Sequence, residues 1–384
     1  MKNLLIWIIL LFLFNCSSNP KIVSERNLEE QLIEKPQINY RLNSLPKVIN
    51  VIYFADSNIK NTFPDEVKGL LTNYYLFSNK NKYFPTIKFI NLNQVNSCSV
   101  TIDRETYNFF FLLHDSLQNQ SHDLCLNKFL NRETLLVSNS KNIKISNKLR
   151  TYVVDRNEDK LKLIEFMSSY SQRIMVIDNE VTKDKYEIGE IWEKRFNKEI
   201  SEYNTLSKNF SGQDIFSSML LSEQSIKRKR KLSRIISKDL DLIARTREDI
   251  DTLFLSVSTQ EARRLKPALD YIFFKGTEVF LLNDWRDDSN FLKTDKDLEG
   301  VISIDIPFMI PTSLPEDLKE VDNKTRNFAI GYDAFEIALM TKGARNLNRL
   351  NYKGLTGKIT FNDKSINRES TIFKIKDGIY EYLN

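Results

Sequence analysis

A strand–helix–strand pattern at residues 247–311 limits the folds that this chain can adopt. The apolar run 253–257 has the composition of a strand that is covered on both faces. A helical pattern follows, and its expected N-cap is Ser258 or Thr259. A second apolar run at 279–282 comes after this helix. The order predicts a βαβ unit, which belongs in a parallel sheet covered by helices.

The same alternation of strand and helix patterns runs through the chain from residue 47 to its end. About 340 ordered residues would remain after an N-terminal signal, more than one compact domain usually holds. We therefore expect an α/β fold of two lobes with doubly wound parallel sheets. The pattern also predicts one long helical region from Gln213 to about Thr246.

Residues 1–16 have the composition of an export signal. Positive charge at Lys2 precedes the apolar run 4–14, which is about half as long as a membrane-spanning helix. The run ends in Leu13-Phe-Asn-Cys16, which predicts a lipoprotein signal peptide with Cys16 as the lipidated residue. The alternative is an ordinary cleaved signal or a membrane anchor, with Cys16 incidental.

The residues after Cys16 indicate where such a lipoprotein would reside. Ser17, rather than aspartate, resembles the residue that follows the cysteine in outer-membrane lipoproteins. We therefore expect a chain that is lipid-anchored at the periplasmic face of the outer membrane. Two or three acyl chains would hold it there stably, where one would not. Residues 17–46 are the expected tether.

The two other cysteines permit one disulfide. In an oxidising periplasm an even number of remaining cysteines is compatible with pairing, so Cys98 and Cys125 are a possible disulfide. The alternative is two reduced, buried and unrelated thiols.

The sequence offers little material for catalysis. It has two histidines, so a His-rich metal site or a Ser-His-Asp triad is not expected. Ser-x-x-Lys occurs at Ser57/Lys60 and Ser138/Lys141, but the Ser-Asp-Asn and Lys-Thr-Gly companions of penicillin-recognising enzymes are missing. The formal net charge of +5 is too mild to indicate nucleic acid. We therefore expect no enzyme activity, no cofactor, no metal and no nucleic-acid partner.

A basic run is the strongest electrostatic feature. It consists of Lys227, Arg228, Lys229, Arg230 and Lys231. One interpretation is a solvated helix face whose apolar neighbours, Leu232, Ile235, Ile236 and Leu240, turn inward. The other is a partner-binding patch for an acidic partner or an anionic envelope polymer, because such charge raises association rates.

Five motifs between residues 247 and 361 resemble the LpoA/LppC family of lipoproteins, the outer-membrane activators of class A penicillin-binding proteins. The matching residues are Arg247, Asp249, Asp251, Phe254 and Leu255; Gln260, Ala262, Arg263 and Pro267; Asp305, Pro307 and Phe308, the last in place of tryptophan; Gly331-Tyr-Asp-Ala; and Gly354-Leu-Thr-Gly-Lys-Ile. The resemblance covers the C-terminal domain of longer family members. It implies a two-lobed fold like that of type I periplasmic binding proteins.

The resemblance also implies how the chain is divided and what it does. Lobe one is expected at about 47–155 and 312–350, and lobe two at about 156–311 and 351–384. The implied function is activation of a class A penicillin-binding protein, a peptidoglycan synthase, by direct contact. The alternative is a lipid-anchored periplasmic solute-binding protein for a small polar ligand, since clefts in this fold class usually bind such ligands.

Overall fold

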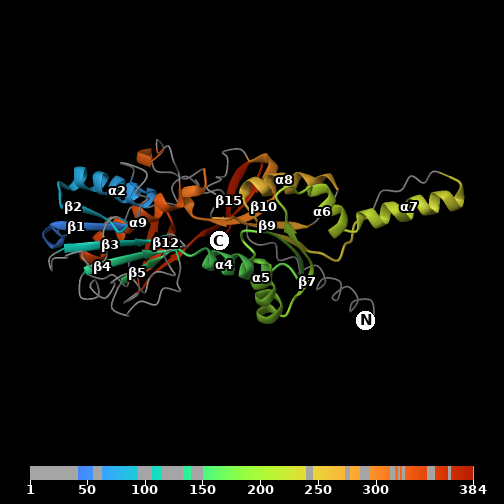
Figure 1. Ribbon diagram of the computed structural model, residues 1–384, viewed down its shortest axis with the longest axis horizontal. Coiled ribbons are helices and arrows are strands. Elements are labelled where there is room, and N and C mark those ends of the chain that lie inside the picture. Colours follow the sequence, from blue (N-terminus) through green and yellow to red (C-terminus); the bar gives the residue numbers. More distant parts are fainter. Residues whose placement is uncertain are drawn as a thin grey trace, which may run out of the picture.

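The computed structural model contains two sheets of mainly parallel strands, each covered by helices (Figure 1). It confirms the expected fold class. The structure describes residues 42–54, 63–93, 106–113, 133–139, 150–238, 245–272, 277–285, 295–311, 316–318, 321, 325–343, 351–361 and 365–383. Cys16, Cys98 and Cys125 lie outside these residues, so the predicted lipidation and disulfide remain predictions.

The first sheet has the strand order β11-β12-β13-β5-β4-β3-β1-β2. Its central strands are buried at nearly every position, as in a parallel sheet that is covered on both faces. The strands are β1 (Val48–Tyr53), β2 (Thr86–Asn91), β3 (Thr106–Leu112), β4 (Glu133–Ser138), β5 (Arg150–Val153), β11 (Asn351–Gly354), β12 (Gly357–Phe361) and β13 (Ser365–Glu369). Strands β1 to β5 and β13 are parallel, and β12 and β11 add an antiparallel hairpin.

The second sheet has the order β15-β14-β10-β9-β8-β6-β7. Five strands are parallel, and β14 and β15 close one edge antiparallel. The strands are β6 (Arg173–Asn179), β7 (Glu199–Leu206), β8 (Thr252–Ser256), β9 (Glu278–Leu282), β10 (Val301–Asp305), β14 (Thr371–Lys376) and β15 (Ile379–Leu383). The predicted βαβ unit is β8, the following helix and β9.

Helices cover the second sheet on both faces. One face packs on α4 (Arg156–Ser168) and α5 (Lys185–Glu190), the latter continued by a π turn at Ile191–Arg195. The other packs on α6 (Gly212–Met219) and α8 (Thr259–Tyr271). Helix α8 begins at the predicted cap: Ser258 accepts from the Glu261 backbone N–H, and the Glu261 carboxylate accepts from the Ser258 backbone N–H.

The C-terminal strands correct the predicted lobe boundaries. Residues 351–384 were expected in lobe two, but β11, β12 and β13 extend the first sheet, and β14 and β15 alone belong to the second. The cause is a long-range pairing: β13 lies parallel to β5, with Ile366 opposite Tyr152. The chain then crosses to the second lobe at Ser370, immediately before β14.

The predicted helix from Gln213 to Thr246 is also corrected. It is two helices, α6 and α7 (Ser222–Ile236), separated at Leu221, whose φ of 58° is left-handed. A residue with that backbone conformation ends the α-helical path, so α7 leaves α6 in a new direction. Figure 1 shows α7 projecting away from the second sheet.

Helices α2 (Asp65–Asn81) and α9 (Arg326–Gly343) cross closely because small residues lie at their contact. A Cβ on Gly331 would lie 1.8 Å from the Glu66 carbonyl oxygen, and one on Gly69 would lie 1.9 Å from that of Phe328. Backbone atoms cannot swing aside as side chains can. The two glycines therefore set the distance between α2 and α9.

We expect Gly331→Ala to destabilise the protein by about 1–3 kcal/mol or more, because the two helices must separate. Gly189→Ala, also in a helix, is the matched control: its Cβ would meet only the hydroxyl of Tyr203, a partly exposed side chain that can move. Chemical denaturation followed by circular dichroism measures both. Equal stability of the two variants would contradict this account of the crossing.

Candidate functional site: the junction between the lobes

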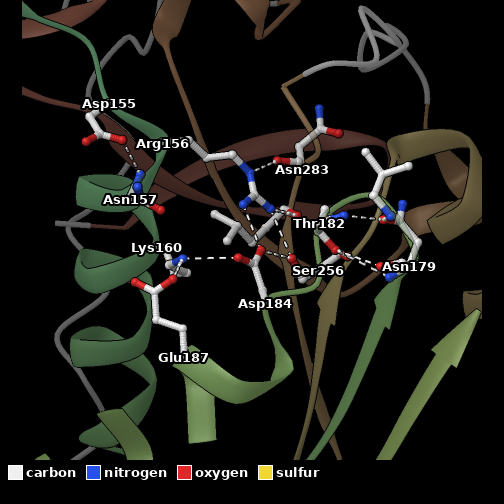
Figure 2. Close-up of polar contacts among 12 residues, drawn as sticks. Asp155, Arg156, Asn157, Lys160, Asn179, Thr182, Asp184, Glu187, Ser256 and Asn283 are labelled. Carbon is white, nitrogen blue, oxygen red and sulfur yellow. Dashed lines mark hydrogen bonds and ion pairs between the residues drawn. The ribbon is translucent and has the colours of Figure 1, made fainter. Parts of the chain in front are cut away.

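The carboxyl ends of β6, β8 and β9 meet where the chain enters the second lobe from β5. Ligands of open α/β sheets bind at such strand ends, so this junction is the candidate site. Asp155 caps α4 here by accepting from the Asn157 backbone N–H at 2.9 Å, and the cap places Arg156 on the first turn of α4. Figure 2 shows the polar side chains that gather beneath this turn.

Arg156 joins two strand ends and a loop. Its Nε donates to the Asn283 carbonyl oxygen at 2.8 Å, Nη1 to Asp184 Oδ2 at 2.7 Å and Nη2 to Ser256 Oγ at 3.0 Å (Figure 2). Ser256 Oγ in turn donates to Asp184 Oδ2 at 2.5 Å. One guanidinium thus connects the first turn of α4 to β8, to the end of β9 and to the loop before α5.

Lys160 is the second cation of this cluster. Its Nζ lies 3.0 Å from Asp184 Oδ1 and 2.5 Å from Glu187 Oε2, and its side chain is only 1% exposed. Burial alone would raise the pKa of Asp184, but Arg156 and Lys160, with the hydrogen bonds from Ser256 and Arg156, hold it below its ordinary value. The carboxylate therefore stays ionised, and Arg156 and Lys160 of the same chain neutralise its charge.

The N-terminus of α8 lies beside this cluster and already holds an anion. Glu261 Oε2 accepts from the Ser258 backbone N–H at 2.9 Å, from Ser258 Oγ at 3.0 Å and from Asn179 Nδ2 at 2.9 Å. The neighbouring cleft has a volume of about 430 Å³, and its lining includes Arg264 and Asp284. A carboxylate of the chain thus occupies the position where a helix N-terminus would bind a ligand anion.

Buried ion pairs tie the two lobes together at the same junction. Arg368 of β13 donates through Nη2 to Asp159 Oδ1 of α4 at 2.7 Å, with exposed side-chain fractions of 0% and 3%. Arg326, the first residue of α9, pairs with Asp305 at the end of β10, at 2.6 Å between Nη2 and Oδ2. Each pair joins a residue of the first lobe to one of the second.

Trp285 lies between these two pairs. Its ring centroid is 5.5 Å from Cζ of Arg326 and 5.4 Å from Cζ of Arg368, within range of cation–π attraction. The ring also packs against the core of the first lobe and against the crossover residues before α9. Separating the lobes at this point would expose one aromatic ring and leave buried charges without partners.

A buried carboxylate shapes the turn between β11 and β12. Asp333 of α9 accepts from the backbone N–H of Leu355 at 2.9 Å, and from the N–H and hydroxyl of Thr356 at 2.7 and 2.6 Å. Burial nevertheless raises the pKa of Asp333 to about 6. A Cβ on Gly354 would lie 2.5 Å from Asp333 Oδ2, so the carboxylate requires glycine there.

Comparison with known proteins relates part of this chain to one family. The model of the LppC putative lipoprotein family matches residues 194–378. The match spans just under half of the chain and supports an LpoA/LppC-family protein. None of the curated proteins matches the chain.

Solved structures show the same fold at low identity. The LpoA (YraM) C-domain from Haemophilus influenzae, titled a regulator of PBP1A, has a TM-score of 0.53 and 12% identity, covering 88% of this chain and 100% of that one. Full-length LpoA from the same organism has a TM-score of 0.56 and 11% identity, and the match covers 90% of this chain and 60% of that one. A putative branched-chain amino acid ABC transporter from Rhodospirillum rubrum has a TM-score of 0.59 and 12% identity, covering 88% and 100%.

The structure assigns local roles to the LppC-like motif residues. Asp305 pairs with Arg326 across the junction, and Asp333 and Gly354 shape the turn between β11 and β12. Phe308 stacks on Phe328 with ring centroids 5.4 Å apart, which fixes the crossover to α9. Several of these motif residues therefore have structural roles at or near the junction between the lobes.

The paired carboxylates Asp249 and Asp251 lie away from this junction. Asp249 pairs with Arg247 through two hydrogen bonds of 2.7 and 2.6 Å. Asp251 Oδ2 accepts from the backbone N–H groups of Gln172 and Arg173 at 2.8 and 3.0 Å, and so holds the start of β6. Both are structural contacts of the second lobe.

The predicted partner-binding residues 227–231 lie on α7, far from the junction (Figure 1). Their apolar neighbours do not turn inward as the first interpretation expected: Leu232, Ile235 and Ile236 are 39%, 69% and 51% exposed. Leu240 lies outside the described residues. The inward-facing interpretation is therefore wrong for these three side chains.

Sequence reasoning missed the residues that make the junction. Arg156, Arg368 and Trp285 belong to no motif, and their partners lie far away in the chain. A usable signal was the run Asn283-Asp-Trp285 directly after an apolar strand, because such positions meet at one edge of a parallel sheet. Within the described ranges no group of three His, Cys, Asp or Glu side chains is placed to hold a metal, and no helix has the length and apolar content to span a bilayer.

Proposed function

We propose that this chain is an outer-membrane lipoprotein that activates a class A penicillin-binding protein by direct contact, without catalysis of its own. The observation that carries the proposal is the LppC family match together with a fold like that of the LpoA C-domain, a regulator of PBP1A. Anchoring at Cys16 belongs to this proposal. An acyl mass on Cys16 in the membrane-extracted chain is expected, and its absence would contradict the lipoprotein part.

The junction supports a scaffold more than a ligand-driven closing protein. The cations Arg156 and Lys160 are neutralised by side chains of the chain itself, and Glu261 fills the α8 N-terminus. A protein that acts by contact needs a fixed surface. The two interlobe ion pairs hold the lobes in one arrangement and so keep that surface fixed. The predicted tether of ~30 residues at about 3.3 Å each would reach at most ~100 Å from the membrane, so a synthase ectodomain must meet the protein partway.

The test is a purified class A synthase of the same organism, assayed on lipid II with and without the full chain in detergent. We expect faster polymerisation or crosslinking when the chain is present, and no product from the chain alone. The matched control is the full chain unfolded by heat and cooled, at the same concentration. No change with any class A synthase of the organism would contradict the proposal.

One observation favours the solute-binding alternative. Asn283 is buried, and neither polar atom of its side-chain amide has a hydrogen-bond partner among the described residues. Buried amides normally have such partners, so a small polar ligand or water could supply them. Native mass spectrometry of the purified chain distinguishes the two functions: a retained metabolite that is lost in Asn283→Ala would favour solute binding.

A further inference from the structure

Helix α7 projects from the second lobe, and hydrogen bonds hold its N-terminal end in place. The backbone N–H of Arg247 donates to the Leu220 carbonyl oxygen at 3.0 Å, and that of Arg245 donates to Ser225 Oγ at 2.8 Å. These contacts hold the returning chain against the start of α7. Beyond them the helix extends away from the second sheet (Figure 1).

The aliphatic side chains of α7 share one side of the helix. At about 100° per residue, all four fall within one half of its circumference. They are Ile226, Leu232, Ile235 and Ile236, with exposed fractions of 37%, 39%, 69% and 51%. Exposure of four large aliphatic side chains on one short helix requires an explanation, because soluble surfaces seldom collect them.

The opposite half of α7 is basic. Lys227, Arg230, Lys231 and Arg234 fall there, and Glu223 is the single acidic residue of the helix. Arg228 and Lys229 lie on the aliphatic half, so the run 227–231 surrounds the helix completely. Long basic side chains can bury their stems along an apolar layer while the charge stays at the polar boundary.

We propose that α7 is a membrane-surface helix that binds a bilayer containing anionic phospholipid. A basic helix with an exposed aliphatic side is the pattern that lies in the interface plane, with the aliphatic side among the acyl chains. Arg228 and Lys229, which lie on the aliphatic half, would lay their stems along the acyl chains and bring their charges to the anionic headgroups. Each Lys or Arg near such a surface strengthens binding about fivefold.

The inference deepens the proposed function, since it rests on an envelope lipoprotein that is already near a membrane. A lipid anchor at one end and α7 in the second lobe would give two attachments. Two attachments would fix the orientation of the protein on the bilayer, whereas a tether alone leaves it free to rotate. The orientation then decides which surfaces face a synthase.

Hydrogen exchange of residues 222–236 tests the inference on the full chain. The chain is reconstituted into vesicles of phosphatidylcholine alone, or of phosphatidylcholine with phosphatidylglycerol. We expect exchange in α7 to slow at least about tenfold only in the anionic vesicles, and to recover in high salt because screening weakens surface attraction. Both samples carry the same N-terminus, so anchoring there does not affect the comparison.

Variants separate the contribution of the charged side chains from that of the aliphatic ones. Replacing Lys227, Lys229 and Lys231 by glutamate is expected to abolish the protection, and Leu232→Ser with Ile236→Ser to reduce it. Ile379→Ser is the matched control, because Ile379 is 57% exposed but lies on β15, in the body of the second lobe. If circular dichroism shows that a variant has lost helix content, the salt dependence of protection in the wild type still tests the inference.

Three results would overturn the inference: equal protection in both kinds of vesicle, protection in neither, or protection in neutral vesicles only when a class A synthase is added. The last would identify α7 as a contact for an acidic protein. The vesicle comparison contains no synthase, so its failure leaves activation in detergent unaffected.

Discussion

Replacing Arg368 by alanine is expected to lower the free energy of unfolding by about 3–5 kcal/mol, because the buried Asp159 carboxylate would lose its cation. The exposed side-chain fractions of this pair are 0% and 3%, so water cannot take the place of the guanidinium. Arg368 also donates to the Thr356 carbonyl oxygen at 3.2 Å and packs on Trp285. The loss should therefore loosen the contact between the lobes as well as the pair itself.

Chemical denaturation monitored by tryptophan fluorescence measures this effect, with two comparisons. The double variant Asp159→Leu, Arg368→Met removes both charges and should regain much of the lost stability. Lys194→Ala breaks an ion pair with Glu190 on the surface, at exposed fractions of 75% and 67%, and should change nothing measurable. A single variant as stable as the wild type would show that the ion pair does not hold the junction.

Local chemistry determined which parts of the fold were predictable. The run 253–257 is apolar at nearly every position because both faces of its strand are buried, and Ser258 caps the next helix through residues three positions apart. Such signals need only a short window of sequence. The βαβ unit and the fold class followed from them.

Long-range pairing determined what could not be predicted. The strand β13 reads like any other short strand, and its place beside β5 depends on residues more than 200 positions away. Arg368 and Asp159 are likewise distant in sequence, so their pairing has no local signature. The exposed side of α7 was misread for a related reason: aliphatic spacing indicates a helix side, but it does not say whether the protein or another surface covers it.

Asp184→Asn is expected to destabilise the protein at neutral pH by about 3–5 kcal/mol, because Arg156 and the buried Lys160 would lose the carboxylate that neutralises them. An asparagine keeps the shape of the side chain but carries no charge. Its amide group would also face two cations, which cannot accept a hydrogen bond. The effect is therefore electrostatic, with little change in packing.

The stabilisation that Asp184 contributes depends on pH. The folded-state pKa of Asp184 lies below its ordinary value, so its stabilisation is complete above the unfolded-state pKa of about 4 and is lost as the pH falls through the folded-state value. The difference in the free energy of unfolding between wild type and variant should thus be largest at neutral pH and shrink in acid.

Asp249→Asn is the matched control. Arg247 lowers the pKa of Asp249 to about 2, but that pair is partly exposed, so the loss of stability should stay below about 1 kcal/mol. Denaturation curves of wild type and both variants at several pH values test this prediction. If the difference in stability between wild type and Asp184→Asn does not vary with pH, the buried charge cluster is not its cause.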